Sequence, residues 1–259
     1  MNAQPNQHAI TVEGLRTQIG DHVIHDGLDL QIRKGEILGL VGGSGSGKTL
    51  LLRTIIMLRE ATAGTVRLFG MDTKELEGAA LANVRRRFAM MFQQGALFSS
   101  LSVLENVAMP IREHLDLSQS TVEELARLKI RFVGLPENSA AKFPSELSGG
   151  MLKRAAVARS LALDPDVLFL DEPTAGLDPI AAHDLDEFVL ELRASLGLTV
   201  VVVTHDLDSL WHMTDRVAYL ADKRVVAVAD LATLSQHPHP QIADYFGGPR
   251  GRASTAAHI

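Results

Sequence analysis

The sequence contains no cysteine. A disulfide framework and a thiolate metal site are therefore both excluded, and the composition fits a reducing compartment. The sequence also lacks an apolar run of the about 18 residues needed to span a bilayer. Its first residues, MNAQPNQHAITVEG, have neither the basic start nor the apolar stretch of a secretory signal. We therefore expect a cytoplasmic protein.

An excess of positive charge is missing as well, because 31 acidic residues outnumber 25 lysines and arginines and leave a net charge of −6. Proteins that bind nucleic acids without sequence preference usually carry an excess of positive charge, so we expect no nucleic-acid partner. The hydrophobic share of 46% and the charged share of 22% are ordinary for a soluble globular protein. A chain of 259 residues can bury a sizeable core.

Short apolar runs rich in Val, Ile and Leu alternate with longer amphipathic stretches along the chain. Continuous hydrophobicity, as in TVVVVT, is typical of parallel strands that are buried on both faces. The sequence therefore predicts an α/β fold with a mostly parallel central sheet. The expected strands are 35–41, 88–92, 167–170, 199–204 and 217–220, and the expected helices are 48–58, 151–163 and 180–196.

Two segments differ from this alternating pattern. Residues 9–32 and 65–69 resemble short strands with turns, which predicts an antiparallel β subdomain at the edge of the fold. Residues from about 96 to 145 lack strong strand signals and indicate a mostly helical insertion, which extends to about 160 when the next helix is included.

The end of the sequence, HPHPQIADYFGGPRGRASTAAHI, is rich in Pro, Gly and small polar residues. This change of composition predicts a folded domain over 8–236 and a C-terminal tail over 237–259. His237 and His239 are potential metal ligands, but a solvated tail is the favoured interpretation.

The segment GGSGSGKT follows an expected strand and precedes an expected helix. Its pattern is typical of a phosphate-binding loop, whose glycines let backbone N–H groups close around phosphate oxygens. The lysine adds a positive charge at the β- and γ-phosphates, and the threonine hydroxyl can bind Mg²⁺. We therefore expect a nucleotide with Mg²⁺ to be bound by Gly42, Gly43, Ser44, Gly45, Ser46, Gly47, Lys48 and Thr49.

The segment VLFLDEP is an apolar run that ends in two carboxylates. Because successive side chains of a strand point to opposite faces, Asp171 and Glu172 can hold separate roles. Asp171 suits the shell of Mg²⁺, and Glu172 is a candidate to polarise a water for attack on the γ-phosphate.

The segment SELSGG at 145–150 directly precedes an expected helix. A Ser-Gly-Gly turn there presents free backbone N–H groups and the positive end of the helix dipole, which suits an anion. The chain thus contains two potential phosphate sites.

ELSGG, VLFLDEP, AGLDP and VVVTHD occur in this order, and together they resemble the nucleotide-binding domain of ATP-binding-cassette (ABC) transporters. The resemblance covers residues 10–236 and implies a P-loop ATPase fold with ATP and Mg²⁺ as cofactors. It also implies a homodimer in which two chains pack head to tail, so that each ATP lies between Lys48 of one chain and Ser148 of the other.

The resemblance implies roles for further residues. Ser148, Gly149 and Gly150 match the signature that grips the γ-phosphate of ATP bound to the opposite subunit. Gln93 matches the glutamine that reaches toward Mg²⁺ and the attacking water, and His205 matches the switch histidine that contacts the γ-phosphate. Asp178 matches the loop residue that communicates across the dimer.

Two positions depart from the family pattern. The signature usually ends in Gln, whereas this chain has Met151, so contacts made by the Gln side chain are lost. An aromatic residue often stacks on adenine near the first strand, where this chain offers Ile19, with His22 and His25 as weaker alternatives.

The segments GALFSSLSVLENV, PIREH and LSGGM are similar in sequence to the ATPase subunit of Mla-type phospholipid transport systems. This implies a peripheral protein on the cytoplasmic side of a Gram-negative inner membrane. The implied partners are an integral-membrane permease, a periplasmic lipid-binding subunit and a small STAS-domain subunit. An ABC ATPase for another solute and a soluble, non-transport ABC ATPase are the alternatives.

Residues 93–114 lie where such domains meet the coupling helix of the permease. We expect an exposed apolar socket there, while the alternative is that the same side chains form the interior of the helical insertion. The side chains concerned are Leu97, Phe98, Leu101 and Val103.

Overall fold

The computed structural model describes residues 7–93 and 95–248 of the chain. Within them, six strands form a central sheet in the order β10-β9-β3-β8-β7-β6. All neighbouring pairs are parallel except β9 and β10, and β7 and β8 are almost completely buried, as their continuous hydrophobicity predicts. The α/β fold class is confirmed. The strands are β3 (Ile37–Gly42), β6 (Phe88–Met91), β7 (Val167–Asp171), β8 (Thr199–Val203), β9 (Arg216–Ala221) and β10 (Arg224–Ala229).

A second sheet is antiparallel and has the strand order β2-β1-β4-β5. The sequence predicts short strands here, but β1 and β2 each span 12 residues. Gly14 and Gly27, which resemble turn signals in the sequence, instead adopt positive φ angles inside the strands, where the register of β1 against β2 shifts. The strands are β1 (His8–Ile19), β2 (His22–Arg33), β4 (Ala63–Leu68) and β5 (Met71–Asp72).

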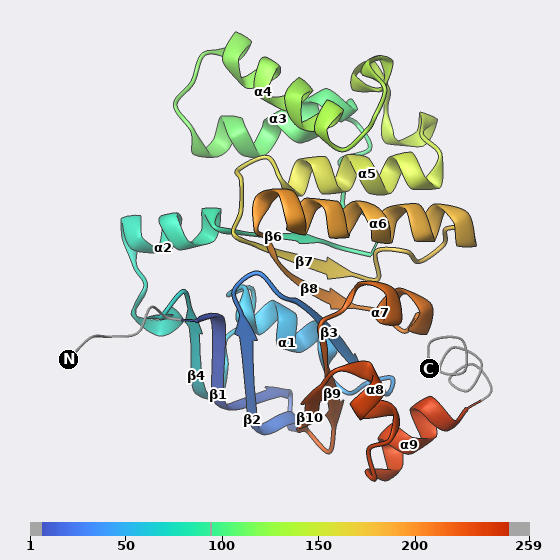
Figure 1. The fold of residues 1–259 in the computed structure, drawn as a ribbon. Coiled ribbons are helices and arrows are strands. Elements are labelled where there is room, and N and C mark those ends of the chain that lie inside the picture. The colour runs from blue at the N-terminus through green and yellow to red at the C-terminus, as the bar shows by residue number, and fades with distance from the viewer. Residues whose placement is uncertain (1–6, 94, 249–259) are drawn as a thin grey trace.

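Helices cover both faces of the central sheet (Figure 1). On one side α1 packs between the two sheets, and on the other α5 and α6 lie under the pair α3 and α4, two helices within the segment 96–160 for which a helical insertion is expected. The helices are α1 (Lys48–Ile55), α2 (Gly78–Arg86), α3 (Val103–His114), α4 (Gln119–Phe132), α5 (Gly149–Ser160), α6 (Pro179–Leu196), α7 (Leu207–Met213), α8 (Leu231–Ser235) and α9 (Pro240–Gly247).

The predicted C-terminal tail is wrong in its first part. Residues after 236 form α9, and Ile242 and Phe246 are buried in a core shared with α7, α8 and β9. The two apolar residues are four positions apart, so they share one helix face, and Pro240 is tolerated because it occupies the first turn. Residues 249–259 of the predicted tail lie outside the described residues.

None of the described helices combines the length and the apolar character needed to cross a bilayer.

Candidate functional site

The loop between β3 and α1 has the backbone that a phosphate cradle needs. Gly42, Gly45 and Gly47 adopt φ angles of 150°, 77° and 95°, which side chains with a Cβ rarely allow. A Cβ on Gly47 would lie 2.4 Å from Nε2 of His25, whereas nothing lies within 4 Å of a Cβ on Gly43 or Gly45. The loop is therefore packed tightly underneath and open above.

The start of α1 presents free donors to this open side. The helix begins after Gly47, and no side chain caps its first N–H groups. Nζ of Lys48 donates to the carbonyl oxygens of Gly42 at 2.8 Å and Gly43 at 3.1 Å. Burial lowers the pKa of Lys48, while Glu172 and Asp171 oppose this shift. An anion at the start of the helix thus meets backbone donors and a lysine already held over the loop.

Carboxylates and a histidine lie at the ends of β7 and β8, next to this loop. The Glu172 carboxylate is within 2.9 Å of Nδ1 of His205, which orients it. Glu172 also has a φ of 49°, and its backbone N–H donates to the Val203 carbonyl at 2.8 Å. Such an uncommon conformation for a non-glycine residue often occurs at functional sites. Burial raises the pKa of Asp171, as does the charge of Glu172, whereas Arg53 and Lys48 lower it.

These groups line one open groove of about 540 Å³. Six residues predicted from the sequence meet here, together with four that the sequence reasoning missed. Arg53 is one of the missed residues, and its position four residues after Thr49 on α1 is the signal that could have identified it. The predicted lining residues are Lys48, Thr49, Gln93, Asp171, Glu172 and His205, and the others are Arg53, Phe92, Ala96 and Val203.

The groove fits a nucleoside triphosphate with Mg²⁺. The free N–H groups of the loop and Lys48 suit phosphate, and the hydroxyl of Thr49, the amide oxygen of Gln93 and the carboxylate of Asp171 are hard oxygen ligands of the kind Mg²⁺ prefers.

A second set of predicted residues lies elsewhere, and the described lining of the groove does not include it. Ser148 caps α5 by accepting a hydrogen bond from the Met151 N–H at 3.4 Å, and its side chain is exposed. Asp178 caps α6 by accepting from the N–H groups of Ile180 and Ala181, both at 3.0 Å.

The two caps of this second set are neighbours. A Cβ on Gly149 would lie 3.2 Å from Leu177, and one on Gly150 would lie 3.9 Å from Ala181. The Ser148–Gly150 turn and the Asp178 cap therefore form one exposed surface, and neither belongs to the described lining of the Lys48 groove.

Lys153 is a further residue that the sequence reasoning missed. Its side chain is 6% exposed, and Nζ donates to the carbonyl of Gln93 at 2.6 Å and to that of Glu172 at 3.4 Å. Burial lowers its pKa, and the charge of Glu172 opposes this effect. Lys153 thus connects the signature helix to two residues of the groove.

The expected apolar socket is present only in part. Phe98 is 43% exposed, with the guanidinium of Arg159 4.9 Å from its ring centroid. Val103 is fully buried at the start of α3, and Leu97 packs against the same helical core. The prediction that Val103 is exposed was wrong, because this position faces the interior of the insertion.

The positions expected to contact adenine differ in their exposure to solvent. Ile19 is 52% exposed, but His25 is completely buried, and Nδ1 forms a hydrogen bond of 2.8 Å with Oγ1 of Thr17. His25 supports the phosphate loop from below and is not available to stack on a base.

Comparisons with known proteins identify the family of the chain. A family model described as ABC transporter matches residues 25–175. The chain is 40% identical to the intermembrane phospholipid transport system ATP-binding protein MlaF of Haemophilus influenzae, over 94% of this chain and 92% of that protein. It is 39% identical to the protein of the same name from Escherichia coli K12, over 88% of this chain and 85% of that protein.

A solved structure is similar as well. The dimeric post-hydrolysis state of the ATP-binding cassette MJ0796, bound to ADP and Pi, has a TM-score of 0.76 and 30% identity over 86% of this chain and 98% of that chain. This likeness, which covers most of both chains, shows the fold of an ATP-binding cassette. The chain therefore belongs to the ABC transporter family, as one of its ATP-hydrolysing ATP-binding proteins.

Proposed function

We propose that two copies of this chain close head to tail around two ATP molecules and drive phospholipid transport between the inner and outer membranes of a Gram-negative envelope. The observation that carries the proposal is the separation of two phosphate-binding surfaces in one chain, the groove at Lys48 and the exposed caps at Ser148 and Asp178. Because one chain does not bring them together, a second copy has to complete each site.

Within the groove, each residue has a role that follows from its position. The Gly42–Gly47 loop, which leads directly into α1, and Lys48 hold the phosphates, and Thr49, Asp171 and Gln93 of the groove lining offer oxygen ligands for Mg²⁺. When bound, ATP with Mg²⁺ supplies the phosphoanhydride bond and the charge neutralisation that phosphoryl transfer requires. Glu172 accepts the proton of the attacking water, and His205 holds the Glu172 carboxylate in place at 2.9 Å.

The second surface acts on the ATP of the partner. Ser148, Gly149 and Gly150 present a hydroxyl and the N–H groups at the start of α5, a helix of 12 residues whose dipole favours an anion. Asp178 lies beside them and links this surface to α6. Lys153 then connects α5 back to Glu172 and Gln93 of its own groove.

The transport role is supported by the similarity to MlaF proteins over most of the chain. The proposed assembly holds the ATPase dimer on the cytoplasmic side of the inner membrane, below an integral-membrane permease. A periplasmic lipid-binding subunit and a small STAS-domain subunit complete the complex. Phe98, which is exposed on the helical insertion, is the proposed contact with the permease.

The test is to purify the complete complex from membranes and to identify the permease and the bound lipid. Glu172→Gln keeps the shape of the side chain but removes the base, so ATP hydrolysis and ATP-driven phospholipid transfer between vesicles should both fall at least about 10²-fold, while ATP binding remains. Near-normal hydrolysis by the variant complex would contradict the role of Glu172. Hydrolysis that drives a different solute would contradict the lipid assignment alone.

A further inference from the structure

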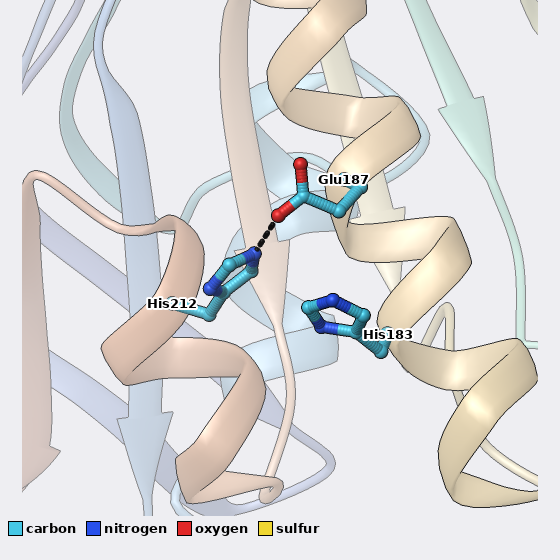
Figure 2. A group of neighbouring side chains, drawn as sticks. All are labelled: His183, Glu187 and His212. Carbon is cyan, nitrogen blue, oxygen red and sulfur yellow. Dashed lines mark hydrogen bonds and ion pairs between the residues drawn. The ribbon is translucent and has the colours of Figure 1, made fainter.

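A cluster of three metal-ligating side chains lies on α6 and α7, outside the ATP groove (Figure 2). His183 and Glu187 are one helical turn apart on α6, so both point to the same side, and His212 approaches them from α7. Their ligand atoms all lie within 4.8 Å of one another, and all three residues are exposed. In the described part of the chain this is the single such cluster of three.

The side chains already face one another. Nε2 of His212 and Oε1 of Glu187 are 2.5 Å apart, and the rings of His183 and His212 have centroids 4.9 Å apart and are inclined at 51°. Two imidazoles and one carboxylate form the ligand set of zinc sites that keep an open position for water. Tetrahedral zinc with bonds of about 2.0 Å requires ligand atoms about 3.3 Å apart, so the atoms need to move by at most about 1.5 Å.

We infer that His183, Glu187 and His212 form a binding site for one divalent transition-metal ion of the zinc class, which joins α6 to α7. The ion takes the place of the hydrogen bond between His212 and Glu187. Imidazole ligands favour Zn²⁺ over Mg²⁺ or Ca²⁺, which prefer oxygen. A fourth position is left for water, because three protein ligands do not complete a tetrahedron.

A buried acidic residue next to Glu187 in the sequence also favours binding of a cation at this cluster. Asp186 is 4% exposed, and its Oδ1 has no hydrogen-bond partner among the described side chains. Its carboxyl interacts electrostatically with His183 and His212. The carboxyl also accepts a hydrogen bond from the Ser209 side chain, so a bound dication adds to the compensation of its buried charge.

The position of the cluster gives the ion a consequence that rests on the proposed function. Helix α6 begins at Asp178 of the exposed surface, and α7 follows His205 of the groove after one residue. The ion therefore fixes the distance between the loop that faces the partner subunit and the histidine that holds Glu172. We expect binding of the ion to slow the exchange between open and closed dimers.

The test uses the untagged full chain, freed of metal with a chelator, in excess Mg²⁺ to occupy the hard oxygen ligands of the groove. Calorimetric titration with Zn²⁺ should give one ion per chain, and Co²⁺ in its place should give the strong visible absorption of a tetrahedral site. His183→Ala and His212→Ala should each weaken Zn²⁺ binding about 10-fold or more. The double variant His237→Ala/His239→Ala is the matched control and should bind as the unchanged chain does.

Thermal unfolding separates binding from a folding defect. Zn²⁺ should raise the Tm of the unchanged chain by a few °C and leave that of His183→Ala unchanged. If His183→Ala is unstable, Glu187→Gln, which keeps the shape but weakens the ligand, replaces it in both measurements. Equal Zn²⁺ binding by the variants, or no binding at all, would overturn the inference. Neither readout involves ATP, so failure here leaves the proposed function untouched.

Discussion

Replacing Gly47 by alanine is a severe test of the phosphate loop. An added Cβ lies 2.4 Å from Nε2 of His25 and 2.6 Å from Cγ2 of Ile24. His25 cannot easily move away, since it is completely buried and held by Thr17 at 2.8 Å. The φ of Gly47 is 95°, which adds backbone strain to the clash.

The steric clash and the backbone strain both lower the free energy of unfolding, and their costs can be added. A left-handed conformation costs a residue with a Cβ about 1–2 kcal/mol, and overpacking costs about 1–3 kcal/mol. The free energy of unfolding should therefore fall by about 2–5 kcal/mol, out of a total of about 5–15 kcal/mol for a typical domain. ATP affinity should fall with it, because the cradle can no longer keep its shape.

Urea unfolding of Gly47→Ala measures this loss directly, with Gly43→Ala as the matched control. A Cβ on Gly43 meets nothing within 4 Å and needs no positive φ, so the control should unfold within about 0.5 kcal/mol of the unchanged chain. Adding His25→Ala to Gly47→Ala should cost at least about 1 kcal/mol less than the sum of the two single losses. A Gly47→Ala chain as stable as the control would refute the reasoning.

The remaining predictions concern the permease contact and the buried lysine. Phe98→Glu should leave folding and ATP binding intact, because the new carboxylate can pair with Arg159. The variant should nevertheless fail to co-purify with the permease. Phe132→Glu, at a site of equal 43% exposure, is the control that should assemble normally. Burial lowers the pKa of Lys153 below its ordinary 10.5. In the alkaline range below pH 10.5 the folded chain therefore binds fewer protons than the unfolded chain. Because of this, the stability of the unchanged chain relative to Lys153→Met should rise with pH in that range. Urea unfolding of both chains between pH 7 and pH 10 checks the sign, and a stability of the unchanged chain relative to Lys153→Met that falls as the pH rises would contradict the lowered pKa of Lys153.

Much of the fold and most of the groove could be predicted because their signals are local. Continuous hydrophobicity marks β7 and β8, and the carboxyl ends of parallel strands meet at the same edge of a sheet. Residues within two positions of the ends of these strands, such as Glu172 and His205, therefore arrive beside the loop that follows β3.

The remaining features depend on packing between distant segments. Lys153 resembles a surface residue in the sequence, and only the position of α5 against Gln93 buries it. His183 and His212 meet because α6 and α7 pack together. The Pro and Gly residues around α9 indicate a tail, but the burial of Ile242 and Phe246 outweighs that local signal.

The shared ATP site is tested most directly by ATP binding to the separated chain. Ser148 is exposed and outside the described lining of the groove, so Ser148→Arg should lose only its cap of about 1 kcal/mol. At dilution this variant should bind ATP as tightly as the unchanged chain yet fail to dimerise when ATP is added, whereas Lys48→Ala should lose ATP binding itself. If Ser148→Arg loses ATP as completely as Lys48→Ala, the two surfaces belong to one pocket and the account of a site shared between two chains is wrong.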